Sequence, residues 1–110
     1  MKKGKIPKNI FSDIPLDFKE EFIEPLVKDS NVKIARIVSR GHRSARDFWY
    51  NQDVNEFVLV LEGEAKLKFK DEKKIAHMRK GDYMIIPVHK EHRIQWTSKN
   101  EDTLWLTVHF

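Results

Sequence analysis

Two side chains that can move a proton or bind a metal, Glu56 and His92, each begin a predicted strand. Alternate side chains of an extended strand point to the same side, which groups Glu56 with Val58 and Val60 and groups His92 with Ile94 and Trp96. We therefore expect both side chains to face an apolar interior. There a carboxylate and an imidazole can exchange protons with a bound molecule or act as ligands of a divalent ion.

A metal site needs more donors than this pair provides. Zinc, iron, manganese and nickel are commonly held by three or four nitrogen and oxygen ligands. Gln52 offers an amide oxygen and His89 a second imidazole, so the expected metal ligands are Glu56, His92, Gln52 and His89. The alternative that stays open is a buried carboxylate and a neutral histidine that hydrogen-bond to their neighbours without a metal.

Aromatic residues near these positions favour a pocket for a small organic molecule. Rings form an apolar wall, and a few polar atoms orient the ligand. His109 shares one face of its predicted strand with Trp105, so it faces either the pocket or the outer surface, and inside the pocket it adds a nitrogen donor. The residues expected to contact the ligand are Trp49, Tyr50, Trp96, Trp105 and His109, unless the rings only fill the core.

Short strands must position these residues, because segments of period-two alternation recur at about ten-residue intervals after residue 30. The clearest strand covers residues 64–70, with Ala65, Leu67 and Phe69 on one side and three lysines on the other. We count about eight strands, of which the first clear one covers residues 32–39. The pattern predicts an all-β barrel or jelly roll, since closure protects the edges of antiparallel strands.

The N-terminal part of the chain differs in pattern. Residues 1–30 are predicted to form an arm with one short helix packed on the barrel, and residues 31–110 to form the barrel. Apolar residues at helical spacing place the helix over residues 17–27, although Pro25 limits its regularity. Residues 56–61 are apolar on both faces, which in so small a domain predicts a homodimer contact.

Composition excludes several classes of protein. The 110 residues suit one domain, and the absence of cysteine excludes disulfides and thiolate chemistry. Lysine and arginine exceed aspartate and glutamate by 21 − 17 = 4, and no basic stripe or stacking motif indicates a nucleic-acid partner. No apolar run approaches the roughly 20 residues that cross a bilayer, so we expect a cytoplasmic protein with no membrane partner. No nucleophile elbow, phosphate loop or dinucleotide fingerprint is present.

Two motifs resemble those of the cupin superfamily of small, RmlC-like jelly-roll barrels, also called double-stranded β-helices. In outline the family motifs are G-x5-H-x-H-x3/4-E-x6-G and G-x5-P-x-G-x2-H-x3-N. Gly81, Pro87 and His92 match the second motif, and Glu56 and Gly63 match the end of the first. The resemblance covers residues 41–96 and implies a single cupin-like barrel.

The first motif departs from the family at its two histidines. In metal-binding cupins these histidines, the glutamate and the histidine of the second motif hold one divalent ion inside the barrel. Here the two histidine positions carry Trp49 and Asn51 or, with the shorter spacer, Tyr50 and Gln52. The resemblance therefore supplies only two of the four family ligands, Glu56 and His92.

The resemblance leaves three functions open, because the cupin fold hosts many unrelated activities. We expect first a barrel that binds a small molecule without turnover, together with a divalent metal if further ligands turn inward. The first alternative is a metal-dependent enzyme of the dioxygenase, isomerase or decarboxylase kind, or a metal-free one that uses Glu56 or His92 as general acid or base. The second alternative is a non-catalytic partner or regulatory domain.

Overall fold

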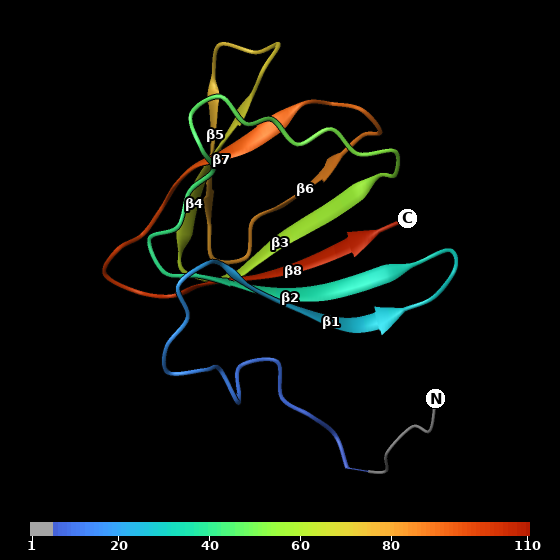
Figure 1. Ribbon diagram of the computed structural model, residues 1–110, viewed down its shortest axis with the longest axis vertical. Helices are drawn as coiled ribbons and strands as arrows, with labels where there is room; N and C mark the ends of the chain where they lie inside the picture. Colours follow the sequence, from blue (N-terminus) through green and yellow to red (C-terminus); the bar gives the residue numbers. More distant parts are fainter. Residues whose placement is uncertain (1–5) are drawn as a thin grey trace.

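Antiparallel strands in two facing sheets form the body of the protein, and a computed structural model describes residues 6–110 (Figure 1). One sheet has the strand order β1-β2-β8-β3-β6 and the other the order β5-β4-β7. This is the all-β jelly roll that the sequence predicts. The eight strands of these residues are β1 Phe22–Lys28, β2 Lys33–Ser39, β3 Glu56–Glu62, β4 Glu64–Phe69, β5 Ile75–Arg79, β6 Tyr83–Ile86, β7 His92–Thr97 and β8 Thr103–His109.

The core lies between the two sheets, where the inward faces of the strands meet. The predicted alternation of β4 is confirmed, because Ala65, Leu67 and Phe69 are all buried while the lysines between them are not. On the facing sheet Val58, Val60 and Trp105 complete the contact, and the other buried members of the cluster are Met78 and Ile86. Burial of these apolar side chains is the main force that holds the sheets together.

Strand register brings chemistry-bearing residues together at one end of the large sheet. Glu56 of β3 lies opposite His109 of β8 and, on its other side, opposite Ile86 of β6. His109 in turn lies opposite Lys33 of β2. Because residues opposite each other in a ladder point to the same face, Glu56 and His109 both face the interior. His92 enters from the other sheet, where it is the first residue of β7.

The predicted short helix over residues 17–27 is wrong, since residues 6–110 contain no helix. Strand β1 occupies most of that range and pairs with β2 at the edge of the large sheet, with an irregularity between Pro25 and Val27. A proline is tolerated at an edge strand, where its missing N–H leaves no ladder partner unpaired. The sheet thus starts at Phe22, within the range assigned to the arm. In the described part of the chain no helix is long and apolar enough to span a membrane.

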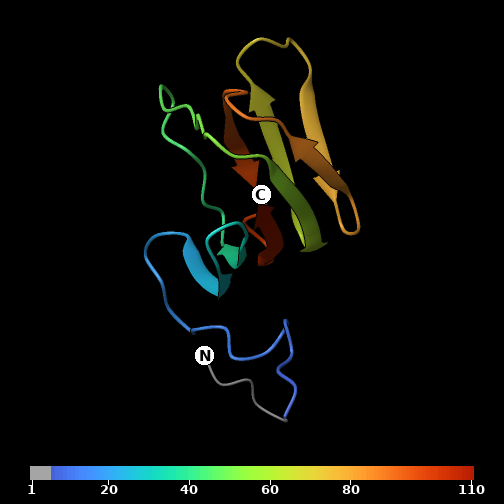
Figure 2. The ribbon, with the colours of Figure 1, turned by 90° about the vertical axis from the view of Figure 1, so that its right-hand side faces the viewer.

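Residues 6–20 form an arm that runs below β1 and β2 (Figure 2). Arg36 of β2 holds the arm to the outer face of the large sheet, because its guanidinium donates to the carbonyl oxygens of Ile10 at 3.0 Å and Ser12 at 2.5 Å. The same guanidinium pairs with Glu24 at 2.6 Å. Arg36 is 4% exposed, so the arm covers it. Residues 1–5 of the predicted arm lie outside the described residues.

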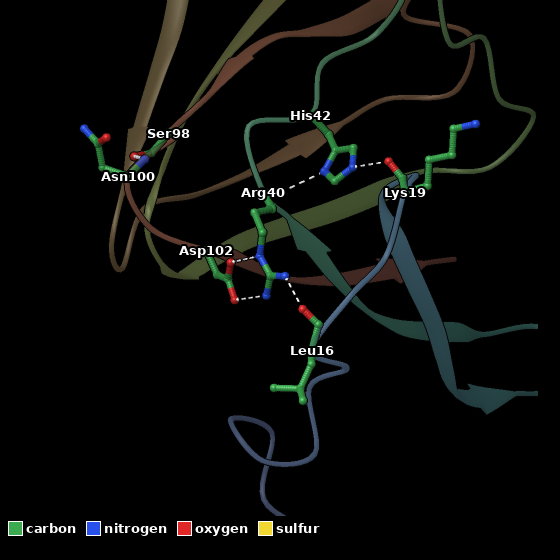
Figure 3. A network of polar contacts seen from close by, with 7 residues as sticks. All are labelled: Leu16, Lys19, Arg40, His42, Ser98, Asn100 and Asp102. Carbon is green, nitrogen blue, oxygen red and sulfur yellow. Dashed lines mark hydrogen bonds and ion pairs between the residues drawn. The ribbon is translucent and has the colours of Figure 1, made fainter.

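A second group of contacts fastens the arm nearer to β1 (Figure 3). The Arg40 guanidinium donates to both carboxylate oxygens of Asp102, at 2.7 and 2.9 Å, and to the carbonyl oxygen of Leu16 at 2.8 Å. These hydrogen bonds lower the pKa of Asp102. His42 accepts the Arg40 backbone N–H and donates from Nε2 to the carbonyl oxygen of Lys19. The arm therefore enters β1 in a fixed position.

Candidate functional site

A cavity of about 210 Å³ lies between the sheets. Its walls are largely apolar and include Ala35, Ile37, Val58, Leu67 and Ile94. A cavity of roughly 150 Å³ with apolar walls is large enough for benzene, so this one accommodates a single ring with polar substituents. The polar side chains that line it are Glu21, Lys33, Tyr50, Gln52, Glu56, His92, Thr107 and His109.

Glu56 lies between two histidines in this cavity. Its Oε1 atom is 3.5 Å from His92 Nε2, and its Oε2 atom is 3.3 Å from His109 Nε2. His92 Nδ1 donates to the carbonyl oxygen of Lys90 at 2.9 Å, which fixes the tautomer and leaves Nε2 facing the carboxylate. The lone pairs of Glu56 Oε1 and His92 Nε2 then face each other and repel, so a proton or a donor group belongs between these two atoms. The predicted inward orientation of both residues is confirmed, since Glu56 is 9% and His92 5% exposed.

Two further polar atoms on the cavity wall have no partner. Gln52 places its Nε2 atom 3.5 Å from His109 Nε2, while its buried Oε1 atom makes no hydrogen bond. The hydroxyl of Thr107 is buried and unpartnered as well. Turning the Gln52 amide over exchanges its two polar atoms but still leaves one of them without a partner. Buried unpaired polar atoms are costly, so both residues favour a bound molecule that satisfies them.

Glu21 is a cavity residue that sequence reasoning missed. It precedes β1 and points inward with Ile23, where one carboxylate oxygen accepts a short hydrogen bond from the Ser39 hydroxyl. Ser39 in turn accepts the Trp105 indole N–H at 3.0 Å. Burial raises the pKa of Glu21, and the charge of Glu56 raises it further. The available signal was the alternation of Glu21 and Ile23, which helical spacing obscured.

Tyr50 lies in the cavity as predicted and holds His92 in place. The two residues form an isolated antiparallel bridge, and their rings stack with centroids 5.5 Å apart. Burial raises the pKa of the Tyr50 hydroxyl, and the carboxylates of Glu21 and Glu56 add to this effect. Tyr50 therefore remains neutral and adds a ring to the cavity wall.

The other predicted aromatic residues separate into two groups. Trp105 is 2% exposed and lines the cavity with His109. Trp49 and Trp96 do not line it. Trp49 lies beneath the Arg93 guanidinium, 4.6 Å from its ring centroid. A register shift in the β4–β7 ladder places Trp96 opposite Lys66, whose Nζ atom is 5.1 Å from the ring centroid, and so reverses the orientation expected from simple alternation.

His89, one of the four predicted metal ligands, lies apart from the other three. It is exposed, and its Nδ1 atom is 2.8 Å from the Asn51 side-chain oxygen. Both residues border an outer groove of about 640 Å³. This groove shares Lys33, Gln52 and His109 with the cavity. These three side chains thus lie at the passage between the solvent and the interior.

The donor set does not fit the divalent metal that the fold permits. Glu56, His92 and Gln52 do come together, and His109 joins them, yet each histidine faces a different oxygen of Glu56 rather than a common point. Over residues 6–110 no three His, Asp or Glu side chains are arranged to hold one ion.

The fold, and the largely apolar cavity with its polar cluster around Glu56, define a small jelly-roll barrel with an interior site. Residues 38–109 match the family model described as Cupin domain, and the chain belongs to the cupin family. No curated protein gives a match.

Solved structures agree with this assignment. A Ralstonia eutropha JMP134 protein, provisionally named a mannose-6-phosphate isomerase, is 36% identical over 94% of this chain and 96% of its own, with a TM-score of 0.90. A cupin superfamily protein of Desulfitobacterium hafniense DCB-2 is 19% identical over 98% and 93% of the two chains, with a TM-score of 0.78. An RmlC-like cupin of Methanocaldococcus jannaschii with a double-stranded β-helix is 21% identical over 96% and 92%, with a TM-score of 0.68.

Proposed function

We propose that this cupin binds one small organic molecule in its cavity, through apolar contact with the walls and hydrogen bonds to the polar cluster around Glu56. The observation that carries the proposal is the pair of buried, unpartnered polar atoms of Gln52 and Thr107 on the wall of an apolar space. A ligand with one ring and a polar substituent fills that space and pairs those atoms. The ligand enters from the outer groove, past Gln52 and His109. The proposal includes no metal.

The proposal predicts that single-ring compounds raise the melting temperature of the wild-type protein in a thermal-shift screen. At a ligand concentration one hundred times Kd the stabilisation is about 2.7 kcal/mol. Ala35→Leu, which extends a larger side chain into the cavity, should lose these shifts. Ile75→Leu, at an exposed position of β5, should keep them. Equal shifts in the wild type and Ala35→Leu would place the binding elsewhere.

A second candidate function is sugar isomerisation, the reaction class in the provisional name of the 36% identical relative. Moving a hydrogen between neighbouring carbons of an aldose needs a base and an acid close together. Glu56 and His92 provide such a pair at 3.5 Å inside the cavity. Conversion of mannose 6-phosphate that is lost in Glu56→Gln would favour this enzyme over a binding protein.

We further propose that the protein is a homodimer that buries the outer face of the large sheet. Phe57 of β3 packs on Tyr83 of β6 with ring centroids 5.4 Å apart, and Tyr83 and Ile85 are 66% and 56% exposed. Exposed neighbouring apolar residues on an edge strand favour contact with a second copy, which presents the same surface through a two-fold axis.

The dimer proposal predicts twice the monomer mass of 13.1 kDa in size-exclusion chromatography with light scattering. Ile85→Lys, which places a charge on the proposed contact, should shift the protein to monomer. Ile75→Lys changes an exposed isoleucine of the other sheet and should leave the dimer intact. A monomeric wild-type protein at high concentration would refute the proposal.

A further inference from the structure

The polar atoms that face the cavity are mostly hydrogen-bond acceptors. Glu56 contributes a carboxylate, and His92 contributes Nε2, which is an acceptor when its Nδ1–H is donated to Lys90. With the Nε2 atom of Gln52 directed at His109, the unpartnered Oε1 atom can only accept, and the hydroxyl of Thr107 accepts as readily as it donates. A molecule that complements this set must bring donors.

The charges around the cavity also favour a ligand that brings donors. Two carboxylates face it, Glu21 from the residue before β1 and Glu56 from β3. The only lysine or arginine that borders the cavity within residues 6–110 is Lys33, at the passage to the outer groove. One oxygen of Glu21 is anchored by Ser39, so the carboxylate stays directed inward. Burial is the main reason that the pKa values of Glu21 and Tyr50 are raised, and the negative charge of Glu56 raises both further. A positive charge between the two carboxylates would relieve their repulsion.

We propose that the cavity selects a small apolar molecule that carries a protonated amine, and that it rejects anions of the same shape. This inference rests on the proposed binding function and names the class of ligand. An ammonium group has three N–H donors and no acceptor, which matches Glu56, His92 and Gln52. An alcohol brings one donor, and a carboxylate brings none. This selection is incompatible with the isomerase candidate, because the phosphate of a phosphorylated sugar would lie among carboxylates.

Isothermal titration with three compounds of one shape tests this selection: benzylamine, benzyl alcohol and sodium benzoate, at neutral pH, with and without a chelator. Benzylamine should bind about tenfold more tightly than benzyl alcohol, because charge-assisted hydrogen bonds are the stronger ones, and benzoate should bind least. Glu21→Gln and Glu56→Gln should each lower the preference for the amine several-fold while benzyl alcohol still binds. Glu62→Gln, an exposed carboxylate at the end of β3, serves as the matched control and should change nothing.

The outcomes separate the selection from the binding function. Benzyl alcohol or benzoate binding as tightly as benzylamine would overturn the amine selection and leave the cavity as a binding site. An amine affinity that the chelator abolishes would also overturn it, because a metal would then hold the ligand. Binding of none of the three would overturn both proposals. The melting temperature of unliganded Glu21→Gln should not fall below that of the wild type, so a loss of amine binding cannot be assigned to unfolding.

Discussion

Gly63→Ala should lower the melting temperature by roughly 10 °C or more. Gly63 connects β3 to β4 with φ +88°, and a Cβ atom there would lie 2.6 Å from both the Asp102 carbonyl oxygen and the Thr103 Cα atom. The left-handed backbone costs about 1–2 kcal/mol in any other residue, and forced overpacking adds about 1–3 kcal/mol. Since both contacts are with backbone atoms, β8 itself must move. Thermal unfolding followed by circular dichroism measures the effect.

Gly81→Ala is the matched control for this substitution. Gly81 has the same φ of +88°, but a Cβ atom there meets nothing within 4 Å. Its substitution should cost only the backbone strain, about 1–2 kcal/mol. The difference in melting temperature between the two variants measures the cost of crowding between the β3–β4 connection and β8. Equal melting temperatures for the two alanine variants would show that the crowding at Gly63 does not matter.

Arg36→Met should destabilise the protein by about 1.5–3 kcal/mol, because it removes the charged donor that the carbonyl oxygens of the arm share. The substitution keeps the apolar stem but leaves the carbonyl oxygens of Ile10 and Ser12 without their donor and Glu24 without its partner. The arm should then become accessible to protease. Thermal unfolding and limited proteolysis measure the two effects.

Arg40→Met is the companion variant, because Arg40 also binds the arm, at Leu16, and pairs with Asp102. Arg40 is exposed, so solvent screens its ion pair and replaces its hydrogen bonds. The melting temperature of Arg40→Met should stay close to that of the wild type. If Arg36→Met proved as mild as Arg40→Met, the buried guanidinium would not be what holds the arm.

The fold was largely predictable because alternation directly reports which face of a strand is buried. The pattern of Ala65, Leu67 and Phe69 gave β4, and the two-sided apolar run gave β3. Alternation did not identify the strand within residues 17–27, because apolar spacings of three and four residues suit a helix as well as an irregular edge strand. Pairing of Phe22 with Val38 and of Ile23 with Ile37 decided between them, and neither pairing is visible in local sequence.

The side to which a site residue points was predictable where it depends on alternation within one strand. It was not predictable where it depends on the register between strands. Glu56 and His92 face inward as their own strands require. The choice for His109 between pocket and surface needed the β3–β8 register, which places it opposite Glu56. Trp96 was assigned to the wrong side because the irregularity near Lys66 is set by pairing with β4. Glu21 was missed because the strand that follows it, β1, was predicted as a helix.

The most direct test of an interior binding site uses the indole N–H resonances of the three tryptophans, recorded by NMR during titration with a stabilising single-ring compound. Trp105 borders the cavity, whereas Trp49 and Trp96 lie outside it beside Arg93 and Lys66. Binding in the cavity predicts a shift of the Trp105 resonance while the other two stay in place. A saturable shift of Trp49 or Trp96 with Trp105 unchanged would contradict the interior site and favour a protein that works through its outer surface.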